Sequence, residues 1–217
     1  MNNPVTKDDL FLAYSTIVGY LKQNTSDAQL LENFIGTEAR AVKALLETCK
    51  SDAAIADSLS HIIGRTFPVH RCNGGQSGGM ITQGPITVNS HCPHHLYPVR
   101  YSAYVSYLPQ DGIVLGLSKL ARICKLLGER PVLHEQLAND IANVLCAPPD
   151  SVSAGFPAIP SDGSAVLLVG THLCMSCRGV KEDAKTSVME LRGSFWKEGM
   201  ENKFYQAVHS IKTGSTF

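Results

Sequence analysis

Hydrophobic side chains recur at helical spacing along the first part of the chain. In residues 8–22 they lie at i, i+1, i+4, i+7, i+8 and i+11, which is typical of an amphipathic helix. A second helical stretch covers residues 28–35. A third begins near Thr37, a residue type favoured at helix N-caps, and continues to Ile55. The pattern predicts a helical N-terminal segment over residues 1–64.

The pattern changes to that of a loop and then to that of strands. Residues 65–84 are rich in glycine, which predicts a loop or a loosely paired hairpin that acts as a linker. Residues 86–91 form a short stretch that contains β-branched side chains. Residues 99–108 alternate between apolar and polar side chains. Residues 109–112 read Pro-Gln-Asp-Gly, a composition that is typical of a turn. We therefore expect two strands here.

Two helices and two more strands complete the pattern. Apolar residues at helical spacing predict helices over residues 116–128 and 131–146. Residues 166–174 and 186–195 have the composition of strands, with Gly193 as a bulge in the second. Phe204, Ala207, Val208 and Ile211 then predict a last helix.

Two hairpins that flank a helix pair indicate an antiparallel sheet with the helices on one face. We therefore expect an α+β fold, with residues 85–217 as the domain that contains the sheet and the helix pair. The length of 217 residues agrees with one domain and an appended helical segment.

Composition narrows the range of partners. The 19 Lys and Arg residues balance the 19 Asp and Glu residues, so no basic field predicts binding to nucleic acid. No apolar run approaches the ~20 residues that span a bilayer, so we expect no membrane insertion. Seven cysteines without a secretory leader favour a reducing compartment, and we expect a cytoplasmic protein.

Two short stretches offer metal ligands. Residues 90–95 read Ser-His-Cys-Pro-His-His, and residues 171–179 contain a second group of cysteines. Thiolates and imidazoles are preferred zinc ligands. Cys92, His95 and Cys174 could bind one zinc and leave a position for water, as in catalytic zinc sites. Taken alone, a Cys-x-x-His motif is equally well explained as a chance pair of buried residues.

The second cysteine group permits two interpretations. If the strand continues past Cys174, then His172, Cys174, Ser176 and Arg178 face one side and Cys177 faces the other. That arrangement argues against a chelating pair of Cys174 and Cys177, although a turn at this point would remove the argument.

Polar and basic side chains gather at two helices. Ser118, Lys119 and Arg122 lie near the start of the helix over residues 116–128, where a phosphate group could bind. Arg40 and Lys43 are three residues apart and share a helix face. Taken alone, an ordinary solvated basic face is the better explanation for Arg40 and Lys43. Ordinary surface charge is also the alternative explanation for Ser118, Lys119 and Arg122.

Four blocks of residues resemble the motifs of the GTP cyclohydrolase type I family. They are residues 90–95, residues 116–122 (Gly-Leu-Ser-Lys-Leu-Ala-Arg), residues 130–135, and residues 171–179, in the same order and at compatible spacing. The resemblance is dense over residues 83–195. It implies a tunnelling fold in which subunits form rings, usually a decamer, with active sites between subunits. It also implies hydrolysis of GTP to dihydroneopterin triphosphate and formate.

The resemblance assigns roles to individual residues. Zn²⁺ would be held by Cys92, His95 and Cys174, and His94 and His172 would be the acid–base pair. Glu135 would recognise the guanine edge, with His134 beside it. The triphosphate would be bound by Ser118, Lys119, Arg122, Arg178, Arg40 and Lys43.

Two departures from the family pattern leave alternatives open. Pro93 stands where the family commonly has Glu, and His134 stands where it commonly has Gln. His134 would touch the base pocket and could alter specificity or rate. One alternative is a non-catalytic homologue that binds a purine or pterin. Another is a related hydrolase that stops at a ring-opened product.

Overall fold

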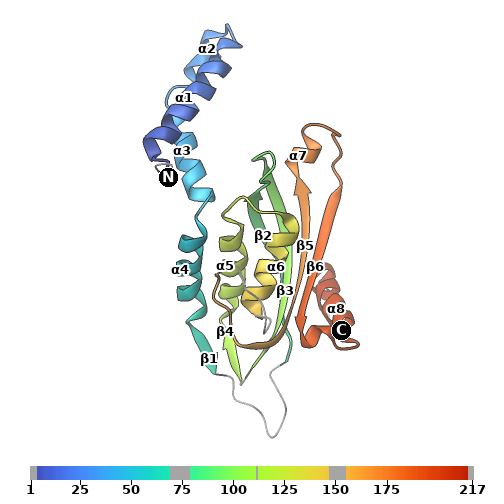
Figure 1. Ribbon diagram of the computed structural model, residues 1–217. Helices are drawn as coiled ribbons and strands as arrows, with labels where there is room; N and C mark the ends of the chain where they lie inside the picture. Colours follow the sequence, from blue (N-terminus) through green and yellow to red (C-terminus); the bar gives the residue numbers. More distant parts are fainter. Residues whose placement is uncertain (1–3, 69–78, 111, 147–154, 215–217) are drawn as a thin grey trace. The chain divides into compact units, whose positions relative to one another are not determined.

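The computed structural model describes residues 4–68, 79–110, 112–146 and 155–214 (Figure 1). The chain divides into two compact units, Met1–Lys50 and Ser51–Phe217. No helix in the described part of the chain is both long enough and apolar enough to cross a bilayer.

The first unit consists of the helices α1 (Lys7–Gln23), α2 (Ala28–Glu32) and α3 (Thr37–Thr48). A capping box fixes the start of α1, because Thr6 Oγ1 accepts from the Asp9 amide and Asp9 Oδ2 accepts from the Thr6 amide. Helix α1 agrees with the sequence prediction for residues 8–22, whereas α2 ends at Glu32 and is shorter than the predicted stretch over residues 28–35.

The predicted continuous helix from Thr37 to Ile55 is wrong. Helix α3 ends at Thr48, and α4 (Asp52–Ile63) begins after Ser51, whose Oγ accepts a hydrogen bond from the Ala54 amide at 3.3 Å. This serine is a standard N-cap, so a new helix starts here. Helix α4 belongs to the second unit, where Ile55 is fully buried.

The second unit is built on a four-stranded antiparallel sheet. Its strand order is β2-β3-β5-β6, formed by β2 (Ile81–His91), β3 (Pro98–Pro109), β5 (Ser161–His172) and β6 (Lys185–Gly193). Strands β2 and β3 form one hairpin, and β5 and β6 form the other. The two hairpins are joined by the pairing of β3 with β5, in agreement with the predicted α+β architecture.

The predicted loop over residues 65–84 contains more regular structure than expected. Strand β1 (Thr66–Pro68) pairs with β4 (Ile113–Leu115) in a separate two-stranded sheet. Strand β2 already begins at Ile81, and its register shifts between Gln83 and Ile86. Residues 69–78 lie outside the described part of the chain.

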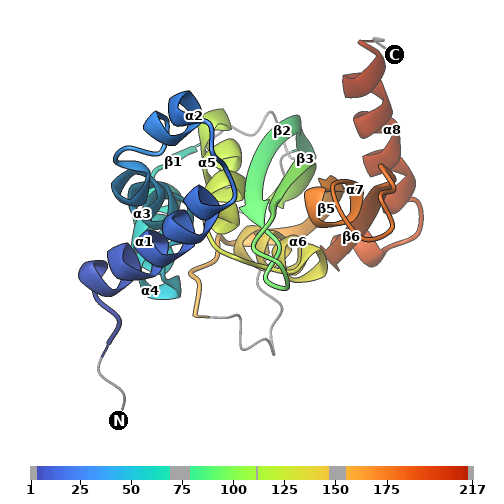
Figure 2. The same cartoon turned by 90° about the horizontal axis from the view of Figure 1, so that it is seen from above.

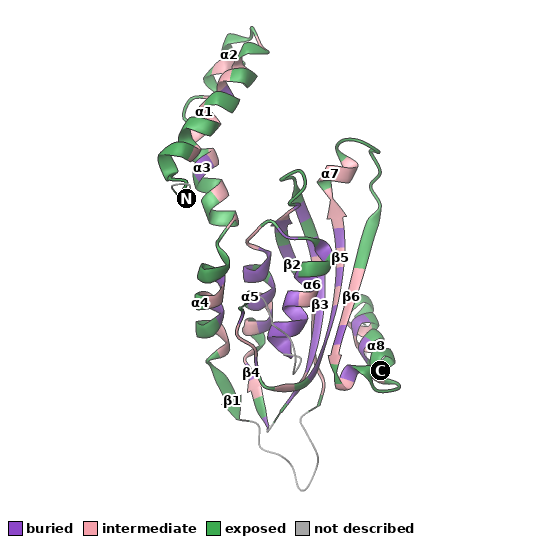
Figure 3. Ribbon diagram, viewed as in Figure 1, coloured by how far each residue is buried: buried purple, intermediate pink, exposed green. Residues whose placement is uncertain are grey.

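Helices α5 (Leu117–Gly128) and α6 (His134–Leu145) pack on one face of the sheet (Figure 2). Their buried side chains join Tyr101, Val105 and Leu168 in the main core. The buried residues of α5 and α6 are purple in Figure 3. The predicted helix pair on one face is therefore confirmed.

The opposite face of the sheet carries a smaller core. Phe204 of α8 (Met200–Thr213) packs there with Tyr104 and with Phe195 of the short helix η1 (Ser194–Trp196). Gly193 has a φ of +56° and caps η1, so it ends β6 and is not a bulge within the strand.

Strand β5 stops earlier than predicted. It ends at His172, and the short helix α7 (Leu173–Ser176) follows, closed by a 2.9 Å hydrogen bond from the Cys177 amide to the Leu173 carbonyl. The expectation that His172, Cys174, Ser176 and Arg178 share a strand face is therefore wrong.

Candidate metal centre

A tight turn between β2 and β3 carries the first two candidate ligands. The Leu96 amide donates to the Cys92 carbonyl at 2.8 Å, and the Cys92 amide donates to the Tyr97 carbonyl at 2.9 Å. Leu96 takes a left-handed φ of 57°, which lets the chain reverse over these few residues. The turn places Cys92 and His95 beside α7.

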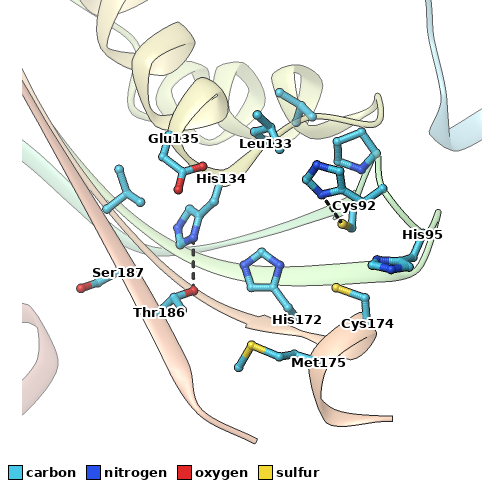
Figure 4. Close-up of a pocket in the computed structure, with 14 residues that line it drawn as sticks. Cys92, His95, Leu133, His134, Glu135, His172, Cys174, Met175, Thr186 and Ser187 are labelled. Atoms are coloured by element: carbon cyan, nitrogen blue, oxygen red, sulfur yellow. Dashed lines mark hydrogen bonds between the residues drawn. The ribbon is translucent and has the colours of Figure 1, made fainter. Parts of the chain in front are cut away.

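Helix α7 supplies the third candidate ligand. The ligand atoms of Cys92, His95 and Cys174 all lie within 4.8 Å of one another (Figure 4). The turn of α7 brings Cys174 to this position, so the predicted grouping exists although the predicted strand does not.

The donor set fits a zinc ion. Zinc binds soft thiolate ligands and intermediate imidazole ligands, and this group offers two thiolates and one imidazole. Three protein ligands leave one of the usual four coordination positions open. Partial burial, together with the neighbouring Cys92 thiol, raises the pKa of Cys174. Two adjacent thiols ionise together only beside a cation, because the two negative charges would otherwise repel each other.

Cys177 is not part of this group. It is exposed at the C-cap of α7, and the three-residue cluster does not include it. Of the two interpretations of this cysteine pair, the described residues therefore favour Cys174 alone.

The two candidate acid–base histidines lie next to the cluster. His94 Nδ1 is 3.7 Å from Cys92 Sγ, and the residue is exposed. His172 ends β5, and burial lowers its pKa. The His172 ring is therefore uncharged at neutral pH and can accept a proton.

A pocket of about 550 Å³ opens beside the cluster. Its wall consists of the cluster, the two histidines, the start of α6 and the edge strand β6 (Figure 4). The lining residues are Cys92, Pro93, His94, His95, Val132, Leu133, His134, Glu135, His172, Cys174, Met175, Thr186, Ser187 and Val188.

Contacts to the end of β2 fix the start of α6 at the pocket. The Val132 amide donates to the His91 carbonyl at 3.1 Å, and Ser90 Oγ donates to the Arg130 carbonyl at 2.9 Å. Glu135 in the first turn of α6 therefore borders the same pocket as the metal cluster.

His134, a polar residue in the first turn of α6, is buried, with 5% of its surface exposed. Its Nε2 lies 3.2 Å from the Leu168 carbonyl oxygen, and its Nδ1 lies 3.3 Å from Thr186 Oγ1. The burial comes from contact with β5 and β6. Helical periodicity in the sequence cannot predict such contacts with distant strands.

Tyr101 is a residue of this region that sequence reasoning did not assign to the site. Its ring centroid lies 4.7 Å from that of His134 and 5.8 Å from that of His172. Its hydroxyl is buried without a hydrogen-bond partner among the described residues. Burial, followed by the nearby Cys92, Glu135 and Cys174, raises the pKa of Tyr101, so the ring stays uncharged.

Gly170, which pairs with Tyr101 across β3 and β5, leaves room for that ring. A Cβ at Gly170 would lie 2.6 Å from two Tyr101 ring carbons and 3.5 Å from His134 Cε1. We therefore expect Gly170→Ala to lower the free energy of unfolding by about 1–3 kcal/mol through overpacking. Denaturant titration measures this loss.

Gly19→Ala is the matched control. A Cβ at Gly19, inside α1, meets no heavy atom within 4 Å, so we expect unchanged stability or a gain of about 0.5–1 kcal/mol. If Gly170→Ala were as stable as the parent protein, the close packing between Gly170 and Tyr101 would be refuted.

The predicted phosphate-binding residues do not line this pocket in the described part of the chain. Ser118 and Arg122 are exposed on α5, Lys119 is half-buried there, and Arg178 is exposed after α7.

The other two predicted phosphate ligands, Arg40 and Lys43, lie in the first unit. Arg40 donates to the Ile35 carbonyl and to Thr37 Oγ1, both at 2.9 Å. Lys43 lies 3.9 Å from a Glu47 carboxylate oxygen, in an exposed pair.

A family model and the curated relatives agree on one family. A family model described as GTP cyclohydrolase I matches residues 13–209. The GTP cyclohydrolase 1 of Thermoanaerobacter pseudethanolicus is 43% identical over 111 residues, which cover 51% of this chain and about half, 54%, of that protein. The GTP cyclohydrolase 1 of Pelagibacter ubique is 30% identical over 200 residues, which cover 90% of this chain and 87% of that protein.

One solved structure, the apo form of the archaeosine synthase QueF-Like, aligns with 54% of this chain and 97% of its own. The TM-score of 0.37 at 18% identity is too low for this likeness to inform the fold.

Proposed function

The chain belongs to the GTP cyclohydrolase I family, and on that premise we propose that it is a zinc-dependent enzyme that converts GTP and water into 7,8-dihydroneopterin triphosphate and formate. The observation that carries the proposal is the convergence of three kinds of residue on one pocket. Candidate metal ligands, two histidines and a carboxylate all border it.

Cys92, His95 and Cys174 would hold the zinc ion. A zinc ion with an open position lowers the pKa of bound water to about 7 and so provides a nucleophile at neutral pH. The attacked atom, C8 of the guanine, is a poor electrophile, so the reaction needs both this nucleophile and a proton donor.

His94 and His172 would transfer the protons. Protonation of the imidazole nitrogen of guanine makes C8 more electrophilic, and a later opening of the ribose ring also needs acid–base help. His172 is uncharged at neutral pH because burial lowers its pKa, which suits a residue that first accepts a proton. His94 lies beside Cys92, close enough to act on the same reacting atoms.

Glu135 would recognise the guanine edge. A carboxylate has two acceptor oxygens, and the edge of guanine offers a ring N–H and an amino group as donors. Glu135 lines the pocket from the first turn of α6, at a position from which it can face a bound base.

The triphosphate would be bound by cations from more than one subunit. Within this chain Ser118, Lys119, Arg122 and Arg178 are absent from the pocket wall, whereas several cations are needed to neutralise a triphosphate. A tunnelling-fold ring, usually a decamer in this family, would bring such residues, together with Arg40 and Lys43, to a neighbour's pocket.

We expect activity to depend on this assembly. Light scattering coupled to an activity assay measures both quantities in the same fractions. A fully active monomer would contradict the shared site. Because the ligand thiols must stay reduced to bind zinc, the proposed place of action is the cytoplasm.

The experiment that tests the function is incubation of the purified protein with GTP, following formate release and pterin fluorescence. The proposed activity releases one formate for each pterin that it forms. Formate without pterin would instead indicate a hydrolase that stops at a ring-opened product. Binding of GTP with neither signal would indicate a non-catalytic homologue.

A further inference from the structure

A chain of hydrogen bonds runs from the backbone of β5 through His134 to the pocket. His134 Nε2 lies 3.2 Å from the Leu168 carbonyl oxygen, and its Nδ1 lies 3.3 Å from Thr186 Oγ1. Thr186 is part of the pocket wall, and its contact with His134 is drawn in Figure 4. His134 itself is buried between these two partners, so its ring orientation is fixed.

The chemistry of these groups sets the direction of each hydrogen bond. A carbonyl oxygen can only accept, so Nε2 of His134 must carry the proton and donate to Leu168. The buried imidazole is uncharged, since burial and the neighbouring His172 ring lower its pKa more than the Leu168 carbonyl and Glu135 raise it. In an uncharged imidazole Nδ1 is then an acceptor, and Thr186 must donate its only hydroxyl proton to it.

This direction determines what Thr186 can offer to a ligand. With its proton committed to His134, the hydroxyl oxygen presents only lone pairs to the pocket. Glu135, which lines the same pocket, also presents only acceptors when ionised. This part of the pocket therefore suits a ligand edge that is rich in N–H donors.

We propose that Thr186 is a specificity-determining residue that accepts a hydrogen bond from the exocyclic amino group of a guanine base, with its hydroxyl oriented by His134. The proposal rests on the proposed function, because it assumes that the guanine of GTP occupies this pocket. The amino group has two N–H bonds, so it can donate one to Glu135 and the other to Thr186. His134 is in this account a positioning residue that does not touch the substrate.

The test compares GTP with inosine triphosphate, which lacks only the exocyclic amino group. The parent protein, Thr186→Val and Thr186→Ser are compared in two assays. The first measures KM and kcat for GTP. The second measures the inhibition constant of inosine triphosphate against GTP. We expect Thr186→Val to raise KM for GTP about tenfold with kcat nearly unchanged, the effect of losing one binding hydrogen bond. Its inhibition constant for inosine triphosphate should stay within about twofold of the parent value.

Thr186→Ser is the matched control. It keeps the hydroxyl and removes only a methyl group, so it should keep the parent preference for GTP. The proposal is overturned if Thr186→Val weakens GTP and inosine triphosphate equally, or if it leaves GTP unaffected. A parent protein that neither binds nor converts GTP would refute the proposed function instead, so the two failures are distinguishable.

Nitrogen NMR of histidine-labelled protein tests the orientation independently of activity. We expect the His134 resonances of the ligand-free protein to show a protonated Nε2 and an unprotonated Nδ1. The Nδ1 signal should shift in Thr186→Val, which removes its donor, and keep its position in Thr186→Ser. A protonated Nδ1 in the parent protein would reverse the direction of the Thr186 bond and contradict the proposal.

Discussion

Replacing Cys174 with alanine is expected to abolish zinc binding and, with it, all turnover of GTP. Cys174 belongs to the group of three ligand atoms that lie within 4.8 Å of one another. Without it two protein ligands remain, fewer than the three or four that zinc sites use. Metal analysis of the purified variant should therefore fall from about one zinc per chain to nearly none.

Cys177→Ala is the matched control for this prediction. It removes a thiol three residues away that is exposed and outside the cluster, so zinc content and activity should both be kept. Equal loss of zinc in both variants would mean that the two cysteines chelate the metal as a pair, and the proposed ligand set would be wrong.

The second large effect separates two adjacent histidines. His95 belongs to the cluster, so His95→Ala should lose zinc together with all activity. His94 lies outside the cluster, with its Nδ1 3.7 Å from Cys92 Sγ. His94→Ala should keep zinc and bind GTP, yet lose about 10²–10⁴-fold in turnover, the usual contribution of general acid–base catalysis.

Zinc content, GTP binding and turnover measured side by side decide between the two roles. If His94→Ala were the variant that loses zinc, the ligand assignment would be exchanged between the two residues. If it kept zinc and turned over at the parent rate, His94 would have no acid–base role.

Periodicity was sufficient to predict the sheet and the helix pair, because those elements are long. The alternation over residues 99–108 matches β3, and the helical spacing over residues 116–128 matches α5. The family resemblance carried by four short motifs is confirmed by the family model over residues 13–209.

Short elements and caps were the points where prediction failed. Helix α7 has four residues, too few for a strand pattern and a helix pattern to differ, so the end of β5 at His172 was missed. Ser51 is an N-cap residue at the point where the helix predicted over residues 37–55 divides into α3 and α4.

The polar partners inside the pocket depend on tertiary contacts. His134 lies on the first turn of α6, and it is buried because β5, β6 and the Tyr101 ring of β3 pack around it. Thr186 lies between two other polar residues, Lys185 and Ser187, near the start of β6, and no motif distinguishes it from them. The pairing of Tyr101 with Gly170 likewise requires the register of β3 and β5, which no local pattern contains.

The measurement that tests the central claim most directly is a zinc titration of metal-stripped protein, with formate release from GTP as the readout. We predict no activity without metal, a linear rise on adding zinc, and a plateau at about one zinc per chain, as for a three-ligand catalytic site. Full activity in the verified metal-free protein, or activity restored by zinc in Cys174→Ala as completely as in the parent protein, would contradict it.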